Sequence, residues 1–266
     1  MQLAIWQTQG FPADPAANLA ALERQLASVA GVGGELLLCP ELWLCGYQVP
    51  AQMAALAEAA DGPAARRIAE LARQYGVAVC YGYAERHAEG GKPYNSAQFI
   101  DASGQRLANY RKTHLFGAME RELFTPGERL ETPFRFGDWT LGLLICFDVE
   151  YPEAVRHQAL GGADLLLIPT ALTPEYGAVP QLIVPARAVE NQLFVAYCNH
   201  CGEENGLAYL GGSRVVGPDG EALAAAGTAE CLLLVRLDRA RRAALADCFP
   251  YLPGRRPQLY AALVQG

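Results

Sequence analysis

LLICFDVEYPE, residues 143–153, joins an apolar run to a single cysteine, Cys146, and then to an acidic segment broken by proline. The apolar run is typical of a buried strand, and the segment after it can open a helix. We therefore expect Cys146 at a strand-to-helix elbow, where the strand fixes the thiol and the helix start favours a thiolate. The alternative is that Cys146 is a small buried apolar residue, which is the commoner role of a free cysteine.

The composition is that of a compact globular protein. Of the 266 residues, 52% are hydrophobic and 18% are charged, whereas disordered chains have low hydrophobicity. The net charge is -7 and there is no basic block, so nucleic acid and acidic membrane surfaces are not expected partners. The opening MQLAIWQTQ has no basic segment, and its apolar run is too short for a signal peptide or a membrane span. We therefore expect a cytoplasmic protein.

The cysteines are scattered along the chain, which favours reduced core thiols over disulfides in a large protein without a secretory signal. Cys198 and Cys201 form a CxxC pair in YCNHCG, a pattern found in metal and redox sites. A zinc site needs further ligands at suitable spacing, and no second CxxC or HxxxH occurs. We therefore expect no metal, and the role of the pair stays open.

Strand and helix patterns alternate along the chain and favour a single α/β domain over residues 1–266. Residues 113–127 read as irregular, and the Pro- and Arg-rich residues 247–266 read as a C-terminal extension packed on the body or on a partner subunit. The expected elements are strands at 2–8, 35–39, 77–85, 134–136, 139–145, 164–168, 193–198 and 231–237, helices at 63–75, 152–160 and 179–192 with a further helix that Asp14 caps, and hairpins at 93–116 and 213–227.

Three residues with useful chemistry follow predicted strands: Glu41, Lys112 and Cys146. If those strands share one edge of a sheet, the three side chains converge. A carboxylate near a lysine in a water-poor pocket can take the proton of a thiol. The ammonium, helped by the backbone N–H of Phe147, can stabilise the oxyanion of a tetrahedral intermediate.

The rival is a hydrolase built on histidine. His87 lies in a charged loop and His157 on a predicted helix face, so neither has a catalytic context. His114 and His200 are candidates for the pocket or, equally, for a structural role.

Three segments together resemble the signature segments of the nitrilase, or carbon-nitrogen hydrolase, superfamily. They are PELWLCGY (40–47), NYRKTHLF (109–116) and LLICFDVEYPE (143–153), and the likeness continues through IPTA, ARAVEN and GSRVVGPDG. The resemblance implies a four-layer αββα sandwich of the α/β class and no cofactor. It also implies a subunit that pairs through its helical face, giving a homodimer or a larger homo-oligomer.

The same resemblance implies the roles of the site residues. Glu41 corresponds to the general base, Lys112 to the ammonium that stabilises the oxyanion, and Cys146 to the nucleophile. The family has a second glutamate that helps position the substrate and precedes an aromatic-Pro-Gly segment. In ERELFTPG (120–127), that spacing selects Glu120 over Glu122.

Within the superfamily, YRKTHLFG, LLICFDVEYPE and the CFPYL near the C-terminus resemble short aliphatic amidases of the 5-aminopentanamidase type. The implied reaction is hydrolysis of a small aliphatic carboxamide, such as an ω-amino amide, to carboxylate and ammonia through a thioester. Branches with carboxylate-bearing N-carbamoyl substrates often have arginines just after the nucleophile, where this chain has Asp148 and Glu150. These acidic residues suit an amine-bearing or neutral substrate; alternatively, they only cap the next helix or pair with arginines such as Arg187.

Two other functions stay open. An N-carbamoyl amine hydrolase of the carbamoylputrescine type would release carbon dioxide with ammonia. A non-catalytic binding protein on the same scaffold would use Cys198 and Cys201 to bind metal.

Four residues are expected to contact the small-molecule amide. Phe147 lies at the elbow, and Tyr47, Thr170 and Asn199 follow strands at the same edge. Core packing explains the position of Tyr47 equally well.

Overall fold

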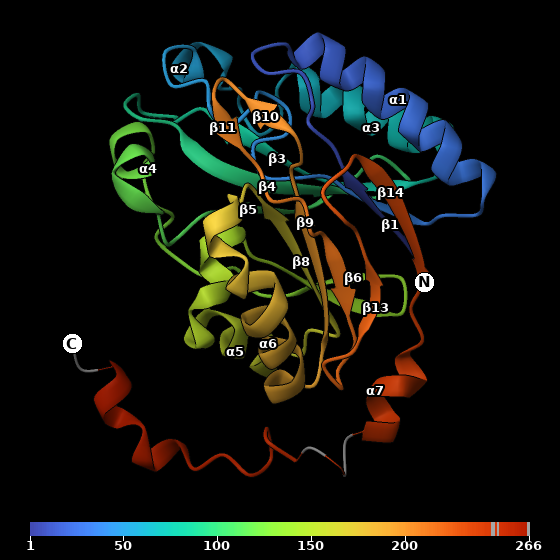
Figure 1. The fold of residues 1–266 in the computed structure, drawn as a ribbon, viewed down its shortest axis with the longest axis vertical. Coiled ribbons are helices and arrows are strands. Elements are labelled where there is room, and N and C mark those ends of the chain that lie inside the picture. The colour runs from blue at the N-terminus through green and yellow to red at the C-terminus, as the bar shows by residue number, and fades with distance from the viewer. Residues whose placement is uncertain (246–247, 249, 265–266) are drawn as a thin grey trace.

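Two six-stranded mixed sheets form the centre of the structure, a computed structural model that describes residues 1–245, 248 and 250–264. Helices α1 (Pro15–Gly31) and α3 (Pro63–Tyr75) lie outside the first sheet, and α5 (Pro152–Leu160) and α6 (Val184–Asn191) lie outside the second (Figure 1). The layers follow the order helices, sheet, sheet, helices. The predicted four-layer αββα sandwich is therefore confirmed.

The first sheet has the strand order β14-β1-β2-β3-β4-β5, in which β1, β2 and β3 are parallel. Its strands are β1 (Gln2–Gln7), β2 (Leu36–Leu38), β3 (Ala78–Glu85), β4 (Tyr94–Ile100), β5 (Arg106–Arg111) and β14 (Cys231–Arg236). The second sheet has the order β13-β12-β9-β8-β7-β6, with β7, β8 and β9 parallel. Its strands are β6 (Phe134–Phe136), β7 (Trp139–Leu143), β8 (Leu165–Thr170), β9 (Phe194–Asn199), β12 (Arg214–Val216) and β13 (Ala222–Ala225).

Shorter elements lie between these strands and helices or follow the last strand. They are α2 (Met53–Leu56), α4 (Gly117–Leu123), the 3₁₀ segments η1 (Cys146–Glu150) and η2 (Pro174–Tyr176), the π-helical η3 (Val179–Ile183), the ribbon of β10 (Glu203–Glu204) and β11 (Leu207–Ala208), α7 (Arg239–Leu245), and the 3₁₀ segments η4 (Pro257–Leu259) and η5 (Ala261–Val264). No described helix combines the length and the apolar character that a bilayer crossing requires.

Both faces of the first sheet are buried because side chains alternate along each strand. In β1, Leu3 and Ile5 join the core between the sheets, whereas Ala4 and Trp6 join the core under α1 and α3. The continuous apolar runs in the sequence follow from this burial on two faces. Asp14 caps α1 as predicted, since its side chain accepts a 3.0 Å hydrogen bond from the backbone N of Ala17.

The prediction that residues 113–127 are irregular is wrong in part, because α4 forms within them. Met119 and Leu123 of this helix pack on a buried cluster that includes Phe124. A helix of two turns without a side-chain cap leaves little periodicity in the sequence. Its stability therefore comes from tertiary packing.

The chain beyond α7 extends below α5 and α6 in the view of Figure 1. Leu252 packs against the main core, whereas Leu259 and Leu263 are 60% and 69% exposed. Residues 247, 249, 265 and 266 of the predicted extension lie outside the described residues. The expectation of a single domain with an extension at 247–266 stays a prediction.

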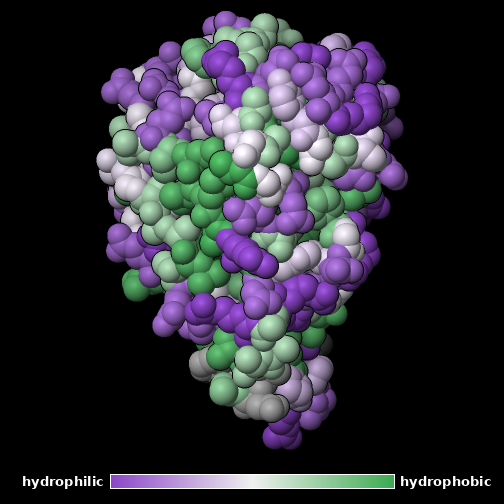
Figure 2. All heavy atoms as spheres, turned by 90° about the vertical axis from the view of Figure 1, so that its right-hand side faces the viewer, coloured by the Kyte–Doolittle hydropathy of each residue, from purple (hydrophilic) through white to green (hydrophobic). Residues whose placement is uncertain are grey.

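Figure 2 shows the side of the molecule that lies on the right in Figure 1, where β14 is at an edge of the first sheet. Hydrophobic residues gather on part of this face, between polar areas. Leu234 of β14 is 39% exposed. The edge of the first sheet is therefore partly apolar at the surface.

Gly82 on β3 supports the turn that carries Glu41, and we expect Gly82→Ala to disturb that turn. An added Cβ would lie 2.6 Å from Pro40 O and 2.8 Å from the carbonyl carbon of Glu41, and closer still to the backbone N of Leu42. Backbone atoms cannot yield as side chains do, so the variant should lose about 1–3 kcal/mol of unfolding free energy. Urea unfolding measures this loss.

The control for Gly82→Ala is Gly31→Ala at the end of α1. A Cβ there meets nothing within 4 Å, so this variant should match the parent or gain up to about 1 kcal/mol from the helix propensity of alanine. Equal stability of the Gly82→Ala protein and its parent would contradict the close approach.

Candidate active site

Glu41, Lys112 and Cys146 follow β2, β5 and β7, so they come from two facing sheets. The three strands therefore do not share the edge of one sheet, which was the condition considered from the sequence. The side chains still converge, because β2 and β5 belong to the sheet that packs against the sheet of β7. The three residues are far apart in the sequence, and packing of the two sheets brings them together in space.

Lys112 lies between two carboxylates. Its Nζ is 2.7 Å from Glu41 Oε1 and 2.7 Å from Glu120 Oε1, and all three side chains are fully buried. We call this set the ion chain. Glu122, the alternative to Glu120, is exposed.

Neighbouring donors add hydrogen bonds to both carboxylates of the ion chain. Asn95 Nδ2 donates to Glu41 Oε1 at 2.7 Å. Tyr47 OH donates to Glu120 Oε1 at 2.8 Å, and the backbone N of Phe116 donates to Glu120 Oε2 at 2.8 Å. Glu41 Oε2 is buried and accepts no hydrogen bond from the described residues. That oxygen is therefore available as a proton acceptor.

Burial dominates the electrostatics of the site. It raises the pKa of Glu41, although Lys112 opposes the shift and Glu120 adds to it. Burial also disfavours the charge of Lys112, but the carboxylates of Glu120 and Glu41 outweigh burial, and the pKa of Lys112 is raised. The ammonium is therefore the stable form of Lys112 in the site.

The pKa of the Cys146 thiol is raised well above its usual value by burial and by Glu41, whereas Lys112 lowers it. The expected preference for a thiolate at the helix start is therefore outweighed by burial. A neutral thiol needs a base to become a nucleophile. Glu41 is the charged group that acts most strongly on it.

The backbone at Cys146 has the sharp turn expected of an elbow. Its φ is 45°, in the left-handed region that non-glycine residues rarely adopt. Cys146 opens η1, and α5 follows at Pro152. The strand-to-helix elbow is confirmed, with a 3₁₀ turn between strand and helix.

Cys146 lines a cavity of about 290 Å³. The predicted contact residues Tyr47 and Phe147 also line it. The full lining comprises Tyr47, Gln48, Phe116, Gly117, Ala118, Met119, Cys146, Phe147, Glu150, Ala171, Leu172, Thr173, Glu175, Tyr176 and Leu207. Mostly aromatic and apolar walls with a few polar groups are typical of small-molecule sites.

Thr170 and Asn199 do not line this cavity, so their expected place in its wall is corrected. Thr170 Oγ1 donates to Ile168 O at 3.2 Å. Asn199 Oδ1 accepts from Leu172 N at 2.7 Å, and its Nδ2 donates to Leu172 O at 3.1 Å. Both side chains are fully buried, and each forms hydrogen bonds with the backbone behind the wall of the cavity.

The histidines take structural positions. His200 is buried, and its Nε2 lies 2.7 Å from the carbonyl oxygen of Glu41. His114 Nδ1 lies 2.7 Å from Asp148 Oδ1. Neither lines the cavity at Cys146, so the arrangement favours the carboxylate-based reading over the histidine-based rival.

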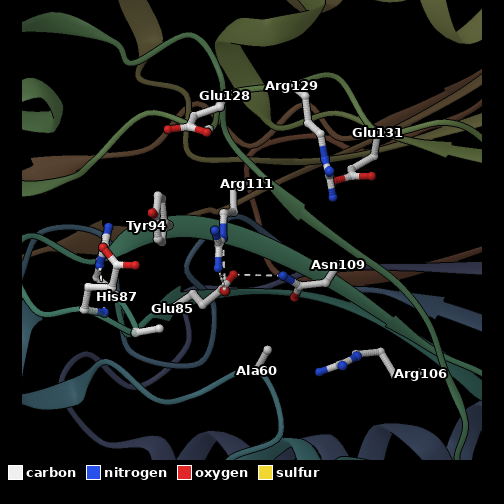
Figure 3. Close-up of a pocket in the computed structure, with 13 residues that line it drawn as sticks. Ala60, Glu85, His87, Tyr94, Arg106, Asn109, Arg111, Glu128, Arg129 and Glu131 are labelled. Atoms are coloured by element: carbon white, nitrogen blue, oxygen red, sulfur yellow. Dashed lines mark hydrogen bonds and ion pairs between the residues drawn. The ribbon is translucent and has the colours of Figure 1, made fainter.

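A larger cavity of about 660 Å³ lies beside β5 (Figure 3). Four of its charged side chains form two pairs: Arg111 Nε is 3.0 Å from Glu85 Oε1, and Arg129 Nε is 2.8 Å from Glu131 Oε1. It contains none of the ion chain and lacks Cys146. We therefore place the chemistry in the smaller cavity.

Cys198 and Cys201 are both buried. The Cys198 thiol donates to Trp6 O and Leu38 O, each at 3.4 Å. Among the described residues, no group of three or more histidine, cysteine or acidic side chains is placed to hold a metal ion. The pair therefore has the surroundings of core thiols.

The sequence did not single out Asn95, Phe116 or Tyr176. Asn95 lies within β4, where nothing distinguishes it from other strand residues. Phe116 and Tyr176 lie in connecting segments whose conformation has no local signal. Among the other lining residues, the sequence did indicate Glu150, four residues after the nucleophile.

We expect Lys112→Met to cost about 3–5 kcal/mol of unfolding free energy at pH 7, because it leaves two buried carboxylates without their cation. Glu41 already has a raised pKa, and loss of Lys112 removes a group that lowers it. A group with a raised folded pKa favours the folded state below that pKa. The deficit should therefore shrink as the pH falls toward about 5.

Urea unfolding at both pH values measures the deficit, with Lys92→Met as the matched control. Lys92 is exposed, and its Nζ bonds only the carbonyl oxygen of Arg121 among the described residues. That variant should stay within about 0.5 kcal/mol of the parent. A Lys112→Met deficit that is small, or that does not change with pH, would contradict the ion chain.

Known proteins resemble this chain over nearly its whole length. It is 44% identical over 261 residues to a "Hydrolase in pqqF 5'region" of Pseudomonas protegens, covering 98% of this chain and 90% of that protein. It is 38% identical over 260 residues to an (R)-stereoselective amidase of Pseudomonas sp., covering 97% and 93%.

A solved structure of the NitN amidase from Nesterenkonia sp. AN1 superposes with a TM-score of 0.88 at 38% identity, covering 99% of this chain and 100% of that chain. Other structures of that amidase hold butyramide, or acrylamide added to the active-site cysteine. The sequence also matches the family described as "Carbon-nitrogen hydrolase" over residues 2–247. With Glu41, Lys112 and Cys146 in the arrangement described above, the chain belongs to the carbon-nitrogen hydrolase family, as the sequence predicted.

Proposed function

We propose that this enzyme is a thiol amidase that hydrolyses small aliphatic carboxamides to carboxylate and ammonia. The observation that carries the proposal is the ion chain beside Cys146, at a cavity of about 290 Å³. The comparisons support it, because both the (R)-stereoselective amidase and the Nesterenkonia amidase are related along almost the whole chain. A cavity of this size suits amides such as the butyramide that the Nesterenkonia enzyme holds.

In the first half of the proposed reaction, Glu41 takes the proton of Cys146 and the thiolate attacks the amide carbon. Glu41 Oε2 suits this role because no described residue bonds it. The oxyanion is stabilised by the Phe147 N–H and by Lys112, whose ammonium has a third donor beyond its bonds to Glu41 and Glu120. Glu41 then gives its proton to the amide nitrogen, the C–N bond breaks and ammonia leaves.

In the second half, Glu41 takes a proton from a water molecule, and the resulting hydroxide attacks the thioester carbon. The C–S bond breaks, the carboxylate product leaves, and the proton returns to Cys146. One carboxylate therefore serves as acid and base in both halves. Glu120 does not exchange protons in this scheme; it holds Lys112 and Tyr47 by hydrogen bonds.

We further propose that the preferred substrates are ω-amino amides such as 5-aminopentanamide. The charged side chains among the described lining residues are the carboxylates Glu150 and Glu175. Burial raises the pKa of Glu150, and no described residue hydrogen-bonds its carboxylate. A half-buried carboxylate in that position gains from a cationic partner. An amine at the far end of a short amide supplies that charge.

An N-carbamoyl amine hydrolase is the second candidate, and the same acidic lining favours it when the substrate also carries an amine. It differs in products, since a carbamoyl group releases carbon dioxide with ammonia. A non-catalytic binding protein is the remaining alternative, and stoichiometric zinc without any hydrolysis would favour it.

We expect ammonia release from a panel of amides to be fastest with ω-amino amides, slower with neutral aliphatic amides and slowest with amides that carry a carboxylate. Cys146→Ala should abolish release, because no thioester can form, while the unfolding transition stays cooperative. Carbon dioxide released in proportion to ammonia from N-carbamoyl amines would favour the second candidate. Undiminished turnover by Cys146→Ala would contradict the thiol mechanism.

Glu150→Gln tests the amine preference within the same panel. It should raise KM for the ω-amino amide about tenfold while changing KM for butyramide by less than about threefold, because only the charged substrate loses a partner. Glu89→Gln, in the larger cavity beside β5, is the matched control. Equal KM changes for both substrates would contradict the proposed binding of the substrate amine by Glu150.

We propose that two subunits pair through the face of α5 and α6. Leu160 on α5 is 53% exposed and Leu182, just before α6, is 68% exposed. Leu259 and Leu263 on the C-terminal segment are exposed as well. Large apolar side chains exposed at a surface favour association. Light scattering should give the molar mass of a dimer or a larger assembly, and the mass of one chain would contradict the pairing.

A further inference from the structure

Asp148 is a fully buried carboxylate that accepts five hydrogen bonds. Oδ2 accepts from Tyr110 OH at 2.8 Å and from Ile145 N at 3.1 Å. Oδ1 accepts from Thr113 Oγ1 at 2.9 Å and, at His114, from the backbone N at 3.0 Å and from Nδ1 at 2.7 Å. A buried carboxylate is costly unless its lone pairs are satisfied, so these bonds fix the geometry around it.

The donors belong to the two segments that carry the reacting groups. Tyr110, Thr113 and His114 lie on either side of Lys112 in sequence. Ile145 directly precedes Cys146, and Asp148 follows it by two residues. One carboxylate therefore links the backbone that holds the ammonium to the backbone that holds the thiol, across the interface between the two sheets.

Asp148 lies outside the wall of the cavity at Cys146 and has no exposed surface. His114, which carries two of the five donors, stacks on Tyr151 with ring centroids 3.9 Å apart. That stacking holds the imidazole, and through it the segment after Lys112, against the start of α5.

We propose that Asp148 is a positioning residue that sets Lys112 relative to Cys146, so that the ammonium meets the oxyanion formed at the thiol. The inference rests on the proposed function. It goes beyond the cap of η1, which needs only the bond from Ile145 N. The other four bonds come from residues 110–114, the segment around Lys112, and capping of η1 does not require them.

Asp148→Asn tests the proposal, because an amide keeps the size but replaces one acceptor oxygen with a donor. A small displacement of a catalytic group lowers kcat and leaves substrate binding largely unchanged. We expect kcat to fall on the order of 10- to 100-fold with KM changed by less than about threefold. The rate at which iodoacetamide alkylates Cys146, relative to exposed Cys248 in the same molecule, should fall at least about fivefold, since Lys112 favours the thiolate.

Asp164→Asn is the matched control. Asp164 is buried, accepts from Thr140 N at 2.9 Å and pairs with Arg242. It precedes β8 and so lies at the opposite end of that strand from Thr170. This variant should lose stability but keep its kcat and its alkylation ratio. A merely structural Asp148 would give the same pattern as Asp164→Asn, and that result would overturn the proposal.

A milder variant covers the case in which Asp148→Asn does not fold. Tyr110→Phe with Thr113→Val removes two donors from the lysine segment and leaves the carboxylate and the Ile145 bond in place. It should lower kcat and the alkylation ratio in the same direction, and unchanged values would overturn the proposal. Alkylation needs no substrate, so the ratio still tests Asp148 if the parent protein hydrolyses no amide and the proposed function fails.

Discussion

A buried ammonium between two carboxylates is the constraint on which the site depends. Lys112 lies 2.7 Å from both Glu41 and Glu120, with no exposed surface on any of the three. Three unit charges out of water are stable only when each is paired and hydrogen-bonded. Asn95 and Tyr47 therefore have defined positions as well. The chain holds Glu41 with one oxygen engaged and the other available.

The two-sheet architecture explains why such a site forms at all. Glu41 and Lys112 come from one sheet and Cys146 from the other, so packing of the sheets brings the base and the thiol together. Gly82 permits the close approach of the Glu41 turn to β3. Small errors in that packing act directly on the site, because close-packed interiors transmit strain.

The sequence was sufficient for the parts of the site that follow buried strands. The strand patterns before Glu41, Lys112 and Cys146 predicted strand ends, and the family resemblance assigned their roles and selected Glu120. Thr170 and Asn199 also end strands, but their side chains bond the backbone behind the cavity. Strand ends identify which residues reach the edge, and only the packed structure decides which of them face the cavity. Loop residues such as Phe116 and Tyr176 depend on tertiary contacts that leave no local pattern.

The ion chain makes a buried thiol the reactive one. Peptide mapping after treatment with fluoroacetamide, a reagent shaped like a small amide, tests this claim most directly. Exposure alone favours Cys248, which is at the surface, over Cys146, which is 7% exposed. We expect Cys146 to be labelled first and the Lys112→Met protein to lose this preference. Labelling of Cys248 while Cys146 stays unmodified would contradict this claim.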